Sequence, residues 1–398
     1  MIQDPIAVTA ILLAIVATLF RVAKTALGKR IFGFVPLIVF CYFVPTLLSN
    51  LGFLPMESAA YTFIKKTLLP ASLFLLTLSV DIPTIKKLGP KVLYLFFGAT
   101  ASVFIGSALT YASLGWLLPA EAHLETWKGL AALCASWIGG GANFVAVGQS
   151  VGASDQTLGL MVIVDVAVAS VWMAVLLYFA GKEKALDEKI GADRSMIDEV
   201  RKRIESYQLS VLQTPNLVDW LSLAALSMSA VAVSTGLAKI LPDIGTIING
   251  FTWIVMIVTA LGVVASYTPL RKLEGAGASV LGSVFLYMLI ATIGAQGDFK
   301  SIVRAPVLVL MGAVWMSFHA GFMLWLRKKL KAPIFFMAVG SQANIGAAAS
   351  APIVASAFHP SLVTVGVLLA ILGYVMGTYL AILNAFLLEQ IYLALYAF

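Results

Sequence analysis

The sequence predicts an all-α polytopic membrane protein. Its 398 residues are 61% hydrophobic and 11% charged, with a mean hydropathy of +0.98, whereas soluble domains carry about 25% charged residues. Apolar runs of about 20 residues, the length that crosses a bilayer as a helix, recur along the whole chain. Two further apolar runs, 129–150 and 332–357, contain glycine and amide side chains where a helix should be continuous. We therefore expect about ten spans and two segments of a different kind.

The ten continuous runs are predicted to be membrane-spanning helices. They cover residues 5–27, 31–51, 61–80, 92–115, 156–180, 217–241, 246–266, 277–296, 305–326 and 361–388. The first run follows an acid, Asp4, and lacks both a basic n-region and a small-residue cleavage site. We therefore interpret it as a span and not as a signal peptide.

The order of the runs divides the chain into two similar halves. Residues 1–180 form the first repeat and contain the 129–150 segment, and residues 215–398 form the second and contain the 332–357 segment. In each half an aspartate, Asp81 or Asp298, precedes basic residues and a proline, and we expect it to cap the helix that follows. The linking residues 181–214 alternate acidic and basic side chains, which predicts an exposed, helix-containing cytoplasmic connector.

The basic residues predict how the two halves are oriented. If both broken segments are re-entrant hairpins, the chain crosses the membrane ten times and 20 of its 26 lysines and arginines become cytoplasmic. The six left outside are Lys65, Lys66, Lys128, Lys239, Lys300 and Arg304. If both segments cross fully, the basic clusters at 21–30 and 327–331 fall on opposite sides. The positive-inside rule thus favours an inverted repeat, with the first hairpin entering from outside, the second from the cytoplasm, and both termini outside.

The first broken segment carries three consecutive glycines, Gly139, Gly140 and Gly141, followed by Asn143. Each glycine costs about 1 kcal/mol relative to alanine inside a helix, and unwound backbone is tolerated at membrane depth only where it lines a cavity or is buried in protein. We expect the three glycines to expose carbonyl groups and the amide of Asn143 to bind an ion or a solute. Gln149, further along the segment, is a second candidate for solute binding.

The second segment has a less glycine-rich tip, Gly-Ser341-Gln342-Ala-Asn344. Ser341, Gln342 and Asn344 are the candidates for solute binding there, near the membrane midplane where the two tips are predicted to meet. The alternative for both tips is that the amides only cap broken helices or join neighbouring spans.

Asp165 lies about ten residues into the 156–180 span. An acid at the centre of a span costs about 2.5–3.5 kcal/mol, so we expect a cation, a proton or hydrogen bonds to hold it. Oxygen ligands from Asp165 and Asn143 suit sodium, a proton is the next possibility, and a structural acid is the alternative. His319, near the middle of another span, is expected to bond a neighbour's backbone.

Several functional classes are disfavoured. The net charge of +7 is explained by cytoplasmic basic loops, so no nucleic acid partner is expected. Cys41 and Cys134 lie in apolar runs and the three histidines form no ligand-spaced cluster, so neither a disulfide framework nor a structural metal site is predicted. No cofactor is expected apart from the coupling ion. The chain also lacks His-Glu-x-x-His, Gly-x-Ser-x-Gly and paired membrane aspartates, so we do not expect an enzyme.

The motif Gly-Gly-Gly-Ala-Asn143-Phe, the following Val-Gly-Ala-Ser154 and the internal Asp165 resemble the YjcL-like family of poorly characterised membrane proteins over nearly the whole chain. The arrangement is more distantly similar to sodium–glutamate symporters and 2-hydroxycarboxylate transporters. That resemblance implies a mobile transport bundle carrying the hairpins, a scaffold bundle through which a homodimer forms, and elevator-like movement. The second tip departs from the pattern because it lacks a doubled glycine.

These observations together predict a secondary active transporter, a symporter of a small polar solute in the lipid of a bacterial inner membrane. The solute is expected to be an organic anion, an amino acid or a short peptide, and the coupling ion sodium or a proton. Because Asp165 follows only the first tip, the ion is expected nearer Asn143 than Asn344. An uncoupled channel or facilitator is the main alternative, and a signalling protein acting through residues 181–214 is another.

Overall fold

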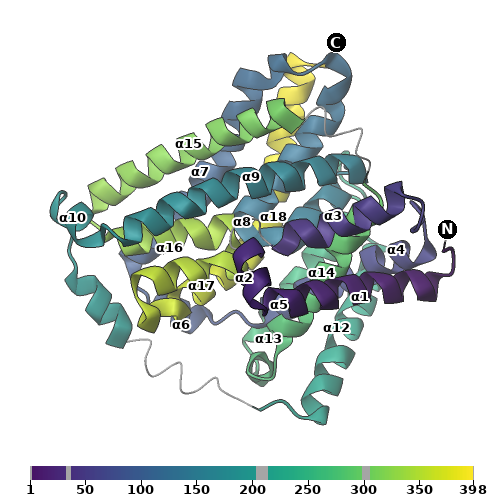
Figure 1. The fold of residues 1–398 in the computed structure, drawn as a ribbon, viewed down its shortest axis with the longest axis horizontal. Coiled ribbons are helices and arrows are strands. Elements are labelled where there is room, and N and C mark those ends of the chain that lie inside the picture. Colours follow the sequence, from purple (N-terminus) through teal and green to yellow (C-terminus); the bar gives the residue numbers. More distant parts are fainter. Residues whose placement is uncertain (1, 33–36, 203–213, 298–304, 398) are drawn as a thin grey trace.

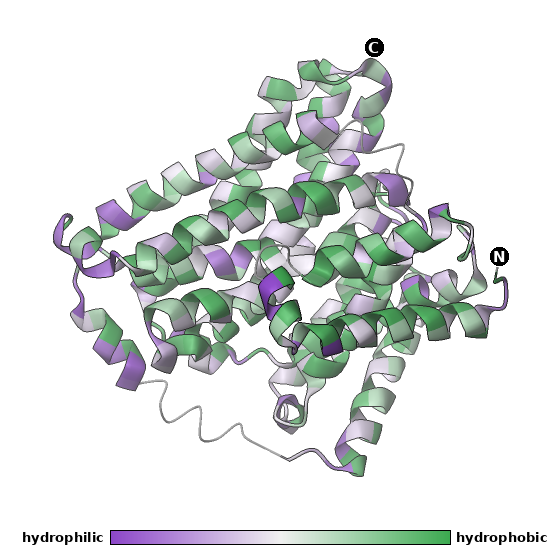
Figure 2. Ribbon diagram, in the orientation of Figure 1, coloured by the Kyte–Doolittle hydropathy of each residue, from purple (hydrophilic) through white to green (hydrophobic). Residues whose placement is uncertain are grey.

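The computed structural model describes residues 2–32, 37–202, 214–297 and 305–397. Within these ranges every regular secondary-structure element is helical (Figure 1). Nine of the described helices are long and apolar enough to cross a membrane, or ten if the bent pair α2 (Ala26–Phe32) and α3 (Leu37–Asn50) is one span. Figure 2 shows hydrophobic residues along the helix bodies and hydrophilic ones gathered at helix ends and around the connector. The prediction of an all-α polytopic membrane protein is confirmed.

One group of helices, called here the flanking bundle, combines the early spans of both halves. In it α14 packs on α3 and α5, α13 packs on α5, and α12 lies outermost against α13. Its elements are α1 (Pro5–Ala23), α3, α4 (Ala59–Phe63), the π-helical turn η1 (Ile64–Leu68), α5 (Leu69–Leu78), α12 (Leu217–Ala238), α13 (Gly250–Ser266) and α14 (Ala278–Ala295).

The remaining long helices form a second group, called here the core bundle. In it α8 packs mainly on α18, α15 on α7, α16 on α7 and α17 on α18. Its elements are α7 (Pro90–Leu114), α8 (His123–Ser150), α9 (Asp155–Ala180), α15 (Ala305–Leu330), α16 (Ile334–Ile345), α17 (Ala347–Phe358) and α18 (Val363–Leu395). Short elements link the helices: α6 (Ile82–Lys86), η2 (Gly115–Leu117), η3 (Ala120–Ala122), α10 (Glu183–Glu188), η4 (Pro269–Glu274) and η6 (Pro360–Leu362).

The helix α8 is interrupted at Gly139 and Gly140, whose backbone angles are not helical. Its two ends lie beside each other. The Glu125 carboxylate, in its first turns, accepts hydrogen bonds from the Ser154 backbone N–H at 2.8 Å and from the Thr157 hydroxyl at 2.7 Å, just beyond its end. The chain therefore turns back at the glycine pair.

The chain also turns back between α16 and α17, so that the start of α16 and the end of α17 lie close together. The backbone N–H of Ile334, which begins α16, donates to Asp187 of α10 at 2.8 Å, and His359, which follows α17, lies 3.0 Å from Glu183 of the same short helix. The two helices run side by side beneath α9 in Figure 1. The turn lies at Gly346 and at Ala347, which has φ +47°.

The two turned segments open at opposite ends of the core bundle. His123, which begins α8, stacks at 4.2 Å on Tyr396, which follows α18. In contrast, η6 and the start of α18 follow directly from His359, at the end held by α10. α9 likewise runs from the open end of α8 to α10. A helix of 26 residues such as α9 spans about 39 Å, so the open ends are separated by the length of the bundle.

Asp81 caps α6, as predicted, because its carboxylate accepts from the Thr84 backbone N–H at 3.1 Å. It also pairs with Arg271 at 3.0 Å. The proposed counterpart in the second half, Asp298, lies outside the described residues, as do residues 203–213 of the connector. The last helix is longer than predicted and reaches Leu395.

Candidate functional site

Asn143 lies just after the turn of α8, fully buried against α18. Its amide nitrogen donates to the carbonyl of Gly139 at 2.8 Å and to that of Tyr374 at 2.9 Å. Its amide oxygen accepts from the Thr378 hydroxyl. Both amide protons and one lone pair of the oxygen are therefore used within the protein, which leaves one lone pair for any further ligand.

Asn344 has a matching set of partners at the turn of the second segment. Its amide nitrogen donates to the carbonyl of Gly340 at 3.0 Å and to that of Phe96 at 3.3 Å, and its oxygen accepts from the Thr100 hydroxyl at 2.7 Å. In both segments the asparagine amide donates to the carbonyl four residues earlier and to a carbonyl of a neighbouring helix. The asparagine oxygen accepts from a threonine that lies one turn after that second carbonyl. The two tips are thus locally alike although they face different helices, α18 and α7.

The three glycines of the first tip are not equivalent. Gly140 has φ +75° and ψ −177°, a conformation that essentially only glycine adopts, and a methyl group on it would lie 2.7 Å from Cβ of Ala347. A methyl group on Gly139 would lie 2.4 Å from the carbonyl oxygen of Gly373. Gly141 has helical angles, and a methyl group there would meet its neighbours at 3.8 Å. The prediction that all three unwind is wrong for Gly141, where the second half of α8 already begins.

The two tips meet beside α18. The close approach of Gly140 to Ala347 joins them directly. A methyl group on Gly373 of α18 would lie 2.7 Å from the carbonyl of Ile138 in the first tip and 3.4 Å from that of Ala343 in the second. The backbones of three elements therefore converge at one point, with little room for side chains between them.

Asp165 of α9 lies beside the first half of α8. Its carboxylate accepts hydrogen bonds from the Ser136 hydroxyl at 2.6 Å and the Trp137 indole N–H at 2.8 Å, and both donors are neutral. No described hydrogen bond joins Asp165 to Asn143, which faces α18 instead. The acid therefore contacts α8 at Ser136 and Trp137, which lie shortly before the glycine turn in the sequence.

A chain of buried hydrogen bonds runs through His319 of α15. Nε2 lies 2.7 Å from the Ser341 hydroxyl, which also accepts from the Trp172 indole at 2.8 Å. Nδ1 lies 2.8 Å from the Ser102 hydroxyl, which donates to the Ala99 carbonyl. These roles fit a neutral ring protonated at Nδ1. His319 is thus held by two serine hydroxyl groups, with the backbone of Ala99 beside the ring, the kind of backbone partner that the sequence predicts.

The remaining candidates lie at different depths. Gln342 is buried at the second tip, where its amide nitrogen donates to Ser350 at 2.6 Å and its Oε1 has no partner among the described residues. Gln149 lies at the open end of α8, 3.4 Å from Asp155, so it does not join the tips. Within the described ranges no group of three metal-ligating side chains is present.

The residues of α18 and α7 that hold the asparagines were not among the predicted site residues. The missed residues are Phe96, Thr100, Gly373, Tyr374, Gly377 and Thr378. The spacing of Gly373 and Gly377 is visible in the sequence and indicates close helix packing. It does not indicate which helix approaches, so sequence reasoning could not link it to the first tip.

Replacing Asn143 with aspartate is expected to destabilise the protein by about 2 kcal/mol or more, because a carboxylate cannot donate to the buried carbonyls of Gly139 and Tyr374. The melting temperature in detergent measures the effect. Asn216→Asp is the matched control, since Asn216 is an exposed N-cap of α12 and aspartate caps helices equally well. Equal melting temperatures for both variants would show that the amide protons of Asn143 do not hold the tip.

The fold and these contacts define a polytopic α-helical membrane protein with a buried polar centre where two interrupted segments meet. The chain belongs to the family described as "Protein of unknown function (DUF819)", whose model matches residues 10–391. It is similar to the "Uncharacterized membrane protein YjcL" of Bacillus subtilis (strain 168), with 25% identity over 352 residues that cover 83% of this chain and 84% of that protein. The resemblance to the YjcL-like family inferred from the sequence is thereby confirmed.

Proposed function

We propose that this protein is a secondary active transporter, a symporter of a small polar solute coupled to sodium or protons. One observation carries the proposal. Two interrupted segments turn back on themselves, open at opposite ends of the core bundle, and bring polar tips together at α18. Paired broken helices that meet near the membrane midplane are the usual way in which such transporters bind solute and coupling ion.

The proposed topology has ten crossings and two re-entrant hairpins. Of the nine long apolar helices, α8 turns back and is not a crossing. The bent pair α2–α3 and the 17-residue helix α13 are crossings in addition to the other eight long helices, which gives ten. Support for α13 comes from its position: Asn249 before it donates to Ser150 at the open end of α8, and Arg271 beyond it pairs with Asp81. Five crossings in each half make the repeat inverted.

The ends of the interrupted helices favour an anionic group on the solute. The second half of α8 begins at Gly141, and α17 begins at Ala347, next to the point where the tips meet. The N-terminus of a helix carries partial positive charge and unpaired N–H groups, which suit a carboxylate. In the proposed mechanism Asn143, Asn344, Gln342 and the carbonyls of the glycine turn bind the solute when the tips separate.

Asp165 is the proposed coupling residue. In the sequence it lies nearer to Asn143 than to Asn344. It is an acid in a span with only neutral hydrogen-bond donors beside it, so sodium or a proton would neutralise its charge. In the proposed cycle the core bundle moves past a flanking bundle that forms the homodimer in a bacterial inner membrane. Movement of Asp165 would then carry the ion with the solute.

The test is solute uptake into proteoliposomes under an imposed sodium or proton gradient. Asp165→Asn is expected to lower gradient-driven uptake at least tenfold, because a neutral amide neither binds a proton nor attracts sodium as a carboxylate does. Asp198→Asn, in the exposed part of the connector, is the control and should leave uptake unchanged. Uptake that no gradient accelerates, and that Asp165→Asn leaves intact, would identify a channel or facilitator instead.

A further inference from the structure

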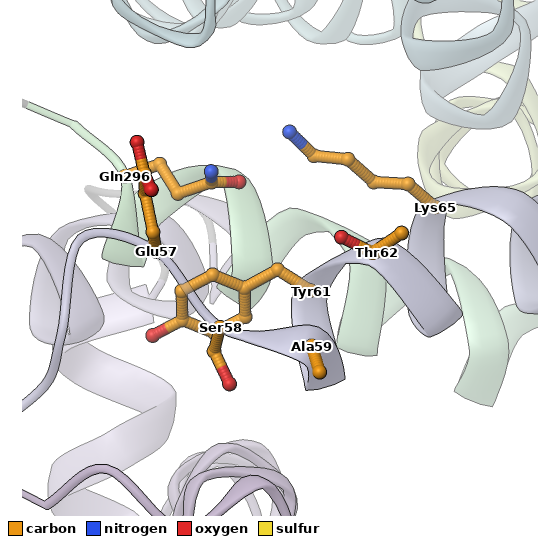
Figure 3. Close-up of a pocket in the computed structure, with 7 residues that line it drawn as sticks. All are labelled: Glu57, Ser58, Ala59, Tyr61, Thr62, Lys65 and Gln296. Atoms are coloured by element: carbon orange, nitrogen blue, oxygen red, sulfur yellow. The ribbon is translucent and has the colours of Figure 1, made fainter.

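One cavity lies away from the tips, at the end of the molecule where α8 opens. It has a volume of about 500 Å³, and its lining comes from the turn before α4, from α4 and η1, and from Gln296 after α14. Figure 3 shows Glu57 and Gln296 on one side of this pocket and the ammonium group of Lys65 on the other. Cavities of about 300–1,000 Å³ are typical of small-molecule sites.

The pocket places an acid and a base around one space. Glu57 is exposed and forms no ion pair with any other described residue. Gln296 lines the same space, and its Oε1 is a buried atom without a hydrogen-bond partner in the described part of the chain. The carboxylate of Glu57 and this oxygen are both acceptors, so together they suit an ammonium group.

Lys65 connects the pocket to the core bundle. Its Nζ lies 2.6 and 2.7 Å from the two carboxylate oxygens of Asp155, the first residue of α9. Asp155 also accepts from Gln149, near the end of α8. The pair therefore ties η1 of the flanking bundle to the open end of the turned segment.

Lys65 lies in an irregular turn of its helix. η1 is a π-helical turn, in which Leu69 donates to the carbonyl of Ile64, and Pro70 follows without a backbone N–H to restore the α-helical pattern. Single π turns within helices occur frequently at functional sites.

We propose that this pocket is an outer binding site for a small zwitterion, an amino acid or a dipeptide. The ammonium group binds Glu57 and Gln296, and the carboxylate binds Lys65 in place of Asp155. The inference rests on the proposed transport function and names the solute class that first binds at the open end of α8. Binding frees Asp155 from the flanking bundle, so arrival of the solute releases the contact between the two bundles.

The exchange is chemically balanced. Lys65 keeps one carboxylate partner, since the solute replaces Asp155. Asp155 keeps its hydrogen bond from Gln149 and its place at the N-terminus of α9, where a negative charge is stabilised. Lys65 thus stays paired, and the Asp155 carboxylate, whose side chain is 21% exposed, is also in contact with water.

The test measures ligand-dependent melting temperatures of the full-length protein in detergent. The probes are alanyl-alanine, its N-acetyl form without an ammonium group, and its C-terminal amide without a carboxylate. We expect the free dipeptide to raise the melting temperature and each blocked form to bind at least tenfold more weakly. Glu57→Gln is expected to weaken the free dipeptide tenfold while leaving the N-acetyl form unchanged.

Glu121→Gln is the matched control, since Glu121 is an exposed acid near the start of α8, and it should bind like the parent. Equal binding of all three probes, or an unchanged affinity in Glu57→Gln, would overturn the zwitterion site. Asp165→Asn separates the two proposals, because it should lower gradient-driven transport and leave binding at the pocket intact. Lost transport with retained binding is therefore the result that both proposals predict. Transport of a dipeptide without any effect of Glu57→Gln on its binding would contradict only the pocket.

Discussion

Gly140→Ala is expected to lower the free energy of unfolding by about 2–4 kcal/mol and to abolish the native meeting of the two tips. Alanine at φ +75° and ψ −177° is strained by about 1–3 kcal/mol, and its methyl group would lie 2.7 Å from Cβ of Ala347. The melting temperature and the monodisperse fraction in size-exclusion chromatography measure the loss.

Gly141→Ala is the matched control one residue away. Its backbone is helical, and the added methyl group would meet Leu286 at an ordinary 3.8 Å. The variant should therefore be as stable as the parent, or more stable by about 1 kcal/mol, because alanine favours helix over glycine. Similar losses for both variants would mean that the turn of α8 is not centred on Gly140.

Asp187→Ala is expected to cost about 3–5 kcal/mol, the usual effect of removing one partner from a buried ion pair. The Asp187 side chain is fully buried, and its carboxylate accepts from Arg327, from Arg194 and from the backbone N–H of Ile334, each at 2.8 Å. The substitution leaves Arg327, which is 5% exposed, without its carboxylate partner, and it removes a negative charge from the N-terminus of α16.

The control is Asp198→Ala in the same connector. Asp198 is 69% exposed and pairs with Arg201 at 3.0 Å, so its loss should change the stability by less than about 0.5 kcal/mol. Thermal melts of both variants and of the parent decide between them. If Asp187→Ala melts with the parent, the connector does not hold the base of the second segment.

The fold class and both interrupted segments could be predicted from local sequence alone. Apolar length predicts the spans, and Gly139 with Gly140 marks a helix break because it combines low helix propensity with an unsatisfied backbone. The second break was located less well. There Ala347 takes the positive φ angle that glycine takes in the first segment, and nothing in an alanine residue predicts that conformation.

The partners of the site residues could not be predicted, because they depend on contacts between distant parts of the chain. Thr100 and Thr378 are ordinary residues in apolar helices, yet each bonds an asparagine more than 230 positions away. Asp187 is a similar case. The alternating charges of the connector predict exposure, whereas packing buries this one carboxylate against Arg327 and α16. Local pattern thus located the breaks, and tertiary packing determined what the breaks contact.

Single-cysteine labelling from each side of the membrane tests the proposed topology, with two opposed hairpins, most directly. The native Cys41 and Cys134 are buried and should stay unlabelled by a membrane-impermeant maleimide. Exposed positions flank both segments: Glu121 and Gln156 lie beside the ends of α8, and Lys331 and Ser361 lie beside the ends of α16–α17. We predict that cysteines at Glu121 and Gln156 both react from outside, and that those at Lys331 and Ser361 both react only from the cytoplasm. Labelling of Glu121→Cys and Gln156→Cys from opposite sides would contradict the account.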